Sequence, residues 1–187
     1  MSESPTEHFE HMEHAEHVAH EGDPFMSTVA MTIAVLAVIA ASVGSLESVE
    51  TAATITSKNE SVLFQNKASD QWAFFQAKSI KKNMYEIAGV TNPDKQAILG
   101  AGAKKNDEES REIQKKAEEL EKKVEEKGEE AERHEGRHHI LTLAVTLLHV
   151  SIAIATVSII TKGARWPWYA ALALGVAGVL TTAKAYI

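Results

Sequence analysis

Three stretches of the chain are apolar at almost every position and contain no Asp, Glu, Lys or Arg: residues 24–46, 140–161 and 166–183. A helix rises about 1.5 Å per residue, so about 20 apolar residues cross a hydrocarbon layer about 30 Å thick. A helix of a water-soluble core is apolar on one face, whereas these stretches are apolar all round. The pattern predicts transmembrane helices over residues 24–46, 140–161 and 166–186.

Residues at the ends of these stretches support the prediction. Asp23 and Pro24 have the residue types of a helix N-cap and of a first helical position. The third stretch opens on Trp166-Pro167-Trp168-Tyr169, which is typical of the aromatic belt at a membrane surface. Residues 1–23 carry seven acids and neither Lys nor Arg. A cleaved signal peptide has a basic leader, so we expect the first stretch to be a retained anchor.

The connection between the first two spans, residues 47–139, has the composition of two helices. Residues 47–88 contain neither Pro nor Gly, and the turn residues Gly, Asn, Pro and Asp gather at 89–94. The fold class predicted is therefore an all-α integral membrane protein: three transmembrane helices, with a long antiparallel, coiled-coil-like hairpin between the first and the second. A disordered acidic linker is the alternative for this connection.

Apolar residues in both arms of the hairpin follow the spacing of a coiled coil. In the second arm the seam predicted is Ile113, Ala117, Leu120 and Val124. In the first arm, the residues expected to face it are Ala73, Ala77, Ile80, Met84 and Ile87.

Basic residues near the spans predict the orientation, because cytoplasmic loops are rich in Lys and Arg. Lys58, Lys184 and five basic residues between 122 and 137 lie on the side of the hairpin, whereas Lys162 and Arg165 lie on the other side. We expect a cytoplasmic hairpin and an N-terminus outside the cytoplasmic membrane, in a multi-pass protein of the bacterial inner membrane.

Small and hydroxylated residues form one stripe on each predicted span, which favours close helix packing or a homo-oligomer in the lipid bilayer. His149 lies within the second span, where an ionisable group is a functional candidate. The alternative is a neutral imidazole that is hydrogen-bonded across a helix interface. The stripes are Ala30, Ala34, Ala37, Ala41, Gly44 and Ser48; Thr142, Thr146, His149, Ala153 and Thr156; and Ala171, Gly175, Gly178 and Thr182.

The tail, residues 1–23, is acidic and rich in histidine, with five imidazoles spaced three residues apart. Neighbours at this spacing on a helix can share a metal ion, and neutral imidazole suits Zn, Cu or Ni. The tail therefore predicts either a site for a divalent transition metal or a response to pH. The alternative is an acidic helix lying beside the membrane. The five candidates are His8, His11, His14, His17 and His20.

A second histidine pattern, His134-Glu135-Gly136-Arg137-His138, matches the H-E-x-x-H motif of zinc hydrolases. Three features weaken it. Gly136 and Arg137 stand where such a helix is usually apolar, the chain has no acid after Glu135, and chance matches are frequent in a segment of this composition. A membrane zinc hydrolase is therefore a distant alternative, and interface residues are the preferred interpretation.

Composition excludes several other functions. The chain has no Cys, so disulfides, thiolate metal sites and cysteine nucleophiles are absent. Phosphate-binding glycine loops, nucleophile elbows and dinucleotide fingerprints are also missing from the sequence. Residues 47–139 hold 16 basic and 19 acidic residues, a net negative charge that repels nucleic acid. We expect neither an enzyme nor a bound cofactor, apart from a metal at the tail.

The segment from Ser69 to Glu86, with its S-D-Q-W and Q-A-K-x-I-K strings, resembles the signature of a bacterial membrane family, the domain-of-unknown-function family forty-three thirty-seven. The resemblance covers nearly the whole chain and implies one early span, a charged helical middle and two late spans. It brings neither an activity nor the H-E-x-x-H motif with it. Within this segment the candidates for a docking surface are Trp72, Gln76, Lys78, Lys81 and Tyr85.

The function predicted is that of a non-enzymatic inner-membrane protein, which self-associates and presents its hairpin for contact with proteins. A hydrophobic lock within the hairpin is the alternative role for the aromatic segment. A metal- or pH-responsive membrane protein, acting through the tail, is the alternative function.

Overall fold

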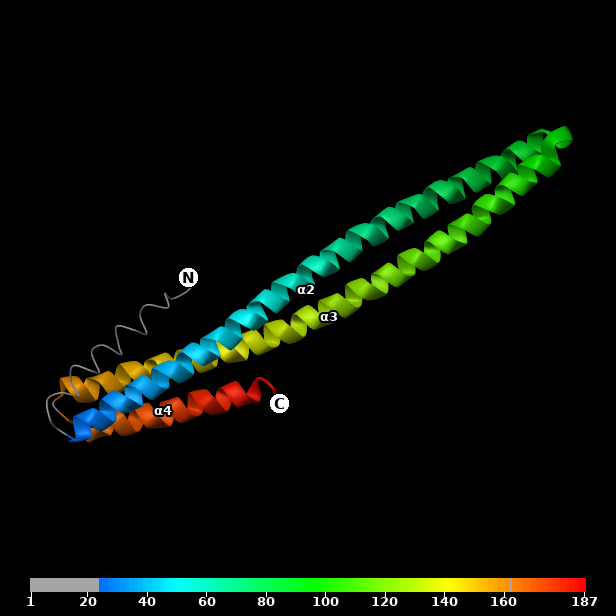
Figure 1. Cartoon of the computed structure of the whole chain (residues 1–187). Helices are drawn as coiled ribbons and strands as arrows, with labels where there is room; N and C mark the ends of the chain where they lie inside the picture. The colour runs from blue at the N-terminus through cyan, green and yellow to red at the C-terminus, as the bar shows by residue number, and fades with distance from the viewer. Residues whose placement is uncertain (1–23, 162) are drawn as a thin grey trace. The chain divides into compact units, whose positions relative to one another are not determined.

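The computed structural model describes residues 24–161 and 163–187, and every regular element in them is a helix. Helix α2 covers Pro24–Thr91, the short 3-10 helix η1 Pro93–Lys95, α3 Gln96–Ile160 and α4 Arg165–Lys184. The all-helical class is therefore confirmed, and two long helices are joined as a hairpin (Figure 1). Three helices are long and apolar enough to cross a membrane.

The chain divides into two compact units. The first, whose described residues are 24–53, 133–161 and 163–187, is called the bundle unit below, and the second, Thr54–Glu132, is called the hairpin unit. Helices α2 and α3 each contribute to both units.

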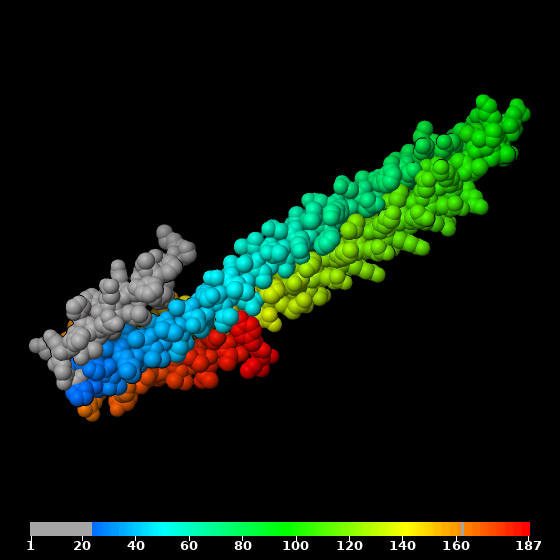
Figure 2. Space-filling view, in the orientation of Figure 1, coloured from blue at the N-terminus to red at the C-terminus, as the bar shows by residue number. Residues whose placement is uncertain are grey.

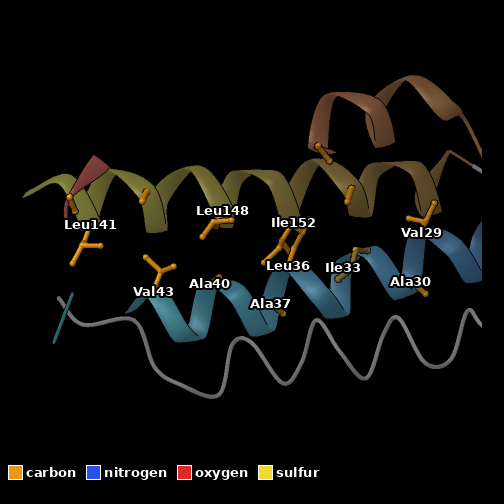
Figure 3. Packing of buried hydrophobic residues seen from close by; sticks show 14 residues of the cluster. Val29, Ala30, Ile33, Leu36, Ala37, Ala40, Val43, Leu141, Leu148 and Ile152 are labelled. Carbon is orange, nitrogen blue, oxygen red and sulfur yellow. The ribbon is translucent and has the colours of Figure 1, made fainter. Parts of the chain in front are cut away.

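The core of the bundle unit is aliphatic. Leu36 on α2 and Leu148 and Ile152 on α3 project into the space between the two helices, and Ile33 and Val29 lie nearer to the start of α2 (Figure 3). The outward side chains of this unit are apolar as well. They include Met31, Val35, Val38, Leu143, Val176 and Leu180. Because apolar groups lie both inside and outside, water is a poor solvent for this unit and lipid a good one.

Small residues on α4 bring this helix close to α2 and α3. A Cβ added at Gly178 would lie 2.9 Å from Cγ of Leu148, and one added at Gly175 would lie 2.7 Å from a terminal carbon of Leu36. Ser151 donates a hydrogen bond of 2.7 Å to the carbonyl of Ala171, which joins α3 to α4. The small stripe of the third span thus faces the inside of the bundle.

The small stripe predicted on α3 does not face the inside of the bundle in the same way. Thr142, Thr146 and Ala153 are exposed, whereas Ala144, Leu148, Ile152 and Ala155 are buried in their place. The stripe on α2 is divided, since Ala30 and Ala37 are buried while Ala41 and Ser48 are exposed.

In the hairpin unit, α2 and α3 run side by side and in opposite directions up to a turn at Asn92 (Figures 1 and 2). Pro93 cannot donate a backbone hydrogen bond, and it starts the short helix η1. The side-chain amide of Asn92 donates to the carbonyl of Ala88, 2.9 Å away, which satisfies one carbonyl at the end of α2.

Both helices of the hairpin unit face each other through residues at strict coiled-coil spacing. On α3 these include the predicted Ile113, Ala117, Leu120 and Val124, all buried or half-buried, so that seam is confirmed. On α2 the inner face, which consists of buried and half-buried residues, is Ser57, Ser61, Phe64, Ala68, Gln71, Phe75, Lys78, Lys82, Tyr85 and Gly89.

The prediction for α2 was wrong in phase. Ile80, Met84 and Ile87 are 61%, 65% and 66% exposed, and Ala73 and Ala77 are exposed as well. These five residues, called the outer stripe below, have the predicted spacing but face away from α3. The inner face packs against α3 instead, because its lysines and aromatic residues contact residues of α3.

Candidate functional sites: a buried carboxylate and a helix with two faces

A buried carboxylate, Glu50 on α2, is the centre of a polar cluster in the bundle unit. Its side chain is only 8% exposed. Nδ1 of His134 lies 2.5 Å from one carboxylate oxygen, where an imidazole N–H donates to the oxygen. The hydroxyl of Tyr186 donates to the other oxygen over 3.3 Å, and the guanidinium of Arg137 lies 3.8 Å away. Three donors from α3 and the C-terminal segment therefore compensate the burial of this charge.

A second carboxylate one turn earlier, Glu47, extends the cluster. It accepts a hydrogen bond of 2.5 Å from the hydroxyl of Thr142 on α3. Nδ1 of His138 lies 3.8 Å from the same carboxylate and 3.0 Å from the hydroxyl of Thr51. The cluster thus joins two acids of α2 to two histidines of α3.

These contacts give the histidines of the H-E-x-x-H match a structural role. His134 and His138 each bind a side chain of α2 rather than converging on a common point with Glu135. Within residues 24–161 and 163–187, no three His, Asp or Glu side chains are grouped so that they could hold a metal ion.

Ion pairs lie along the inner face of the hairpin unit, where a coiled coil usually has apolar residues. Lys82 donates to Asp107 over 2.8 Å, and Lys78 donates to Glu109 over 2.5 Å. The bond from Lys82 holds the pKa of Asp107 below its ordinary value, and the bond from Lys78 does the same to the pKa of Glu109. The pKa of Lys82 is raised in turn. These pairs join the inner face of α2 to α3.

A further ion pair lies nearer to the start of the hairpin unit. Lys127 on α3 contacts Glu130 at 2.7 Å and Glu60 on α2 at 2.9 Å. Hydrogen bonds to these two carboxylates raise the pKa of Lys127. The ammonium group therefore stays charged across the physiological range and joins the two helices.

Aromatic residues in and beside the inner face make further contacts. The indole of Trp72 donates to Glu121 over 2.8 Å, and its ring meets that of Phe75 edge to face at 5.5 Å. Tyr85 packs on Gly102, where an added Cβ would lie 3.1 Å from the ring carbons. A larger residue at position 102 would therefore require the Tyr85 ring to move by a few tenths of an ångström.

The five docking candidates of the aromatic segment divide between the two roles expected for it. Trp72, Lys78 and Tyr85 are half-buried toward α3, which corresponds to the lock, whereas Gln76 and Lys81 are exposed. The ammonium of Lys78 also lies 5.3 Å from the ring centre of Phe74, which is a cation–aromatic contact.

The remaining candidates are the histidine of the second span and the histidines of the tail. His149 is half-buried on α3 within the bundle unit. The tail histidines His8, His11, His14, His17 and His20 lie outside the described residues.

The buried carboxylate was missed from the sequence, although a signal for it exists. Glu47 and Glu50 follow the first apolar stretch, and His134, Arg137 and His138 precede the second. In an antiparallel hairpin these two groups lie at the same level, so opposite charges at matching distances from two spans predict contacts between them.

These features define the class: an all-helical chain with three helices of membrane-spanning length, two of which continue into a hairpin. The family model for the domain of unknown function DUF4337 matches residues 25–187, and the chain belongs to this family. The resemblance seen in the sequence is thereby confirmed. Neither a curated protein nor a solved structure matches the chain.

Proposed function

We propose that the chain is a multi-pass membrane protein without catalytic activity, which self-associates and uses its hairpin unit to bind a protein helix. From the distribution of basic residues we expect it in the bacterial inner membrane, with the hairpin unit in the cytoplasm and the N-terminus outside.

The observation that carries the proposal is the outer stripe. Its isoleucines and methionine are more than half exposed, although they belong to a unit whose surface is otherwise rich in charge. A monomeric soluble helix buries its apolar face, because apolar area in contact with water is unfavourable. Since the spacing is that of a coiled-coil seam, the partner that fits this stripe is another helix.

Two features of the bundle unit support the proposed membrane location and the proposed self-association. Its exposed side chains are largely aliphatic, which suits lipid. Thr142, Thr146 and Ala153 leave a small, hydroxylated stripe exposed on α3. Small residues allow helices of neighbouring copies to approach closely in a bilayer.

The membrane part is tested by extracting cell membranes with alkaline carbonate. The full chain should stay in the pellet, because integral proteins resist this treatment. Release into the supernatant would contradict the proposal.

The binding part is tested by thiol labelling, which is clean because the chain has no Cys. We compare Met84→Cys, on the outer stripe, with Glu86→Cys, two residues away and off the stripe. In native membranes a maleimide should label the first variant more slowly than the second. The difference should disappear when the protein is denatured. Equal labelling in native membranes would refute a covered stripe.

A further inference from the structure

Within the hairpin unit, helix α2 has two seams on nearly opposite faces of the helix. At 3.5 residues per turn each residue advances about 103°, so the midlines of the inner face and the outer stripe lie about 150° apart. The inner face is occupied by α3, and it includes the charged residues Lys78 and Lys82. The outer stripe holds no charge at all. A helix can therefore pack on the outer stripe without displacing α3.

The spacing within the outer stripe sets its heptad positions. A step of three residues leads from a to d and a step of four from d to a, so Ala77 and Met84 are a positions, and Ala73, Ile80 and Ile87 are d positions. A parallel, in-register pair of identical stripes places each residue opposite itself. Every layer of such a pair is apolar.

The residues beside the stripe distinguish a second copy from a charged partner. The flanking e positions are Phe74, Lys81 and Ala88, and the g positions include Gln76 and Asn83. Coiled coils select their partners through charges at e and g, and here Lys81 is the one charge among these flanks. The stripe thus lacks the charge pattern that would recruit an oppositely charged helix.

The same lysine favours one direction of pairing. In a parallel pair a g residue faces the e residue five positions later in the other copy, which puts Gln76 opposite Lys81. In an antiparallel pair of copies e residues face e residues, and in the register that sets Ala77 against Ile87 and Ile80 against Met84 the two Lys81 side chains would meet. Like charges at such distances are unfavourable. Copies inserted in one bilayer with the same topology also present identical helices in the same direction.

We infer that the outer stripe binds the outer stripe of a second copy of this chain, so that two α2 helices pair in parallel and in register. The inference rests on the proposed function and names its partner.

The test is disulfide formation between single cysteines in full-length protein within native membranes. Ala77→Cys and Ile87→Cys are made separately, with Glu86→Cys as the control off the stripe. A parallel pair brings position 77 of one copy next to position 77 of the other, and likewise for position 87. After mild oxidation each stripe variant should give an adduct of twice the chain mass of 20.4 kDa, at a higher yield than the control. Adding Ile80→Asp should abolish the adduct while leaving the helix content by circular dichroism unchanged.

Other outcomes overturn the inference. Positions 77 and 87 are ten residues apart, about 15 Å along a helix, so a parallel pair cannot join them. An adduct that forms only when the two variants are co-expressed indicates an antiparallel pair. An adduct of another mass indicates a different partner, and then the inference fails while the proposed function stands. No adduct, combined with equal labelling of Met84→Cys and Glu86→Cys, removes both.

Discussion

Replacing Glu50 by Ala should destabilise the bundle unit markedly, because the carboxylate is buried and its bond to His134 is charge-assisted. A hydrogen bond to a charged group contributes about 1.5–3 kcal/mol. Arg137 is 3.8 Å away and 42% exposed, so water replaces much of its interaction with the carboxylate. The Tyr186 bond is long at 3.3 Å, and this side chain too is half-exposed. We therefore expect a loss of about 2–3 kcal/mol in the free energy of unfolding, mostly from the His134 contact.

The assay is denaturant unfolding of the full chain in a mild detergent, followed by circular dichroism. Glu60→Ala is the matched control, since Glu60 is also a glutamate of α2 and pairs with Lys127, but its side chain is 44% exposed. Exposed ion pairs contribute little, so this change should have the smaller effect. A double-mutant cycle with His134→Ala isolates the Glu50–His134 interaction. A coupling energy below about 0.5 kcal/mol would refute the assignment of the loss to that contact.

Two further predictions concern the close packing of α4 and the ion pairs of the hairpin unit. Gly178→Ala should lower the stability of the bundle unit by about 1–3 kcal/mol, because the new methyl group overlaps Leu148. Gly44→Ala is the control, since a Cβ at position 44 meets nothing within 4 Å, and it should not lower the stability. Equal unfolding midpoints for the two variants would contradict this prediction. The bond from Lys82 lowers the pKa of Asp107 in the folded state. The contribution of Asp107 to the free energy of unfolding is therefore fully present above the ordinary carboxyl pKa, and it is lost as the pH falls through the lowered pKa. The free energy of unfolding, measured as a function of pH, should fall in acid, and Asp107→Asn should make this fall smaller.

The sequence predicted the elements well, because the physics that determines them is local. Continuous apolar stretches, the absence of Pro and Gly from residues 47–88 and the turn at 89–94 depend only on neighbouring residues. The seam of α3 was also predicted correctly, since Ile113, Ala117, Leu120 and Val124 form the one apolar stripe in a charged segment.

The face of α2 that meets α3 could not be predicted from apolar residues alone. Two stripes of the same period exist on this helix, and counting favours the more apolar one. The choice depends on pairwise contacts between distant residues: Lys82 with Asp107, Lys78 with Glu109 and Tyr85 with Gly102. The same applies to Glu50, whose partner His134 is 84 residues away. A helix period is encoded locally, whereas its phase is decided by the partner.

The two units therefore pose different physical problems. In the bundle unit the outward side chains are apolar, and in the proposed membrane location the solvent that accepts them would be lipid rather than a partner of defined shape. In the hairpin unit, Lys78, Lys82 and Lys127 join the helices through ion pairs, while isoleucine and methionine remain on the surface. If these two faces of α2 were exchanged, Asp107 and Glu109 on α3 would lose their bonds to Lys82 and Lys78. The arrangement of charges thus keeps the outer stripe available, and a helix that covers it gains free energy from burial that the hairpin itself does not use.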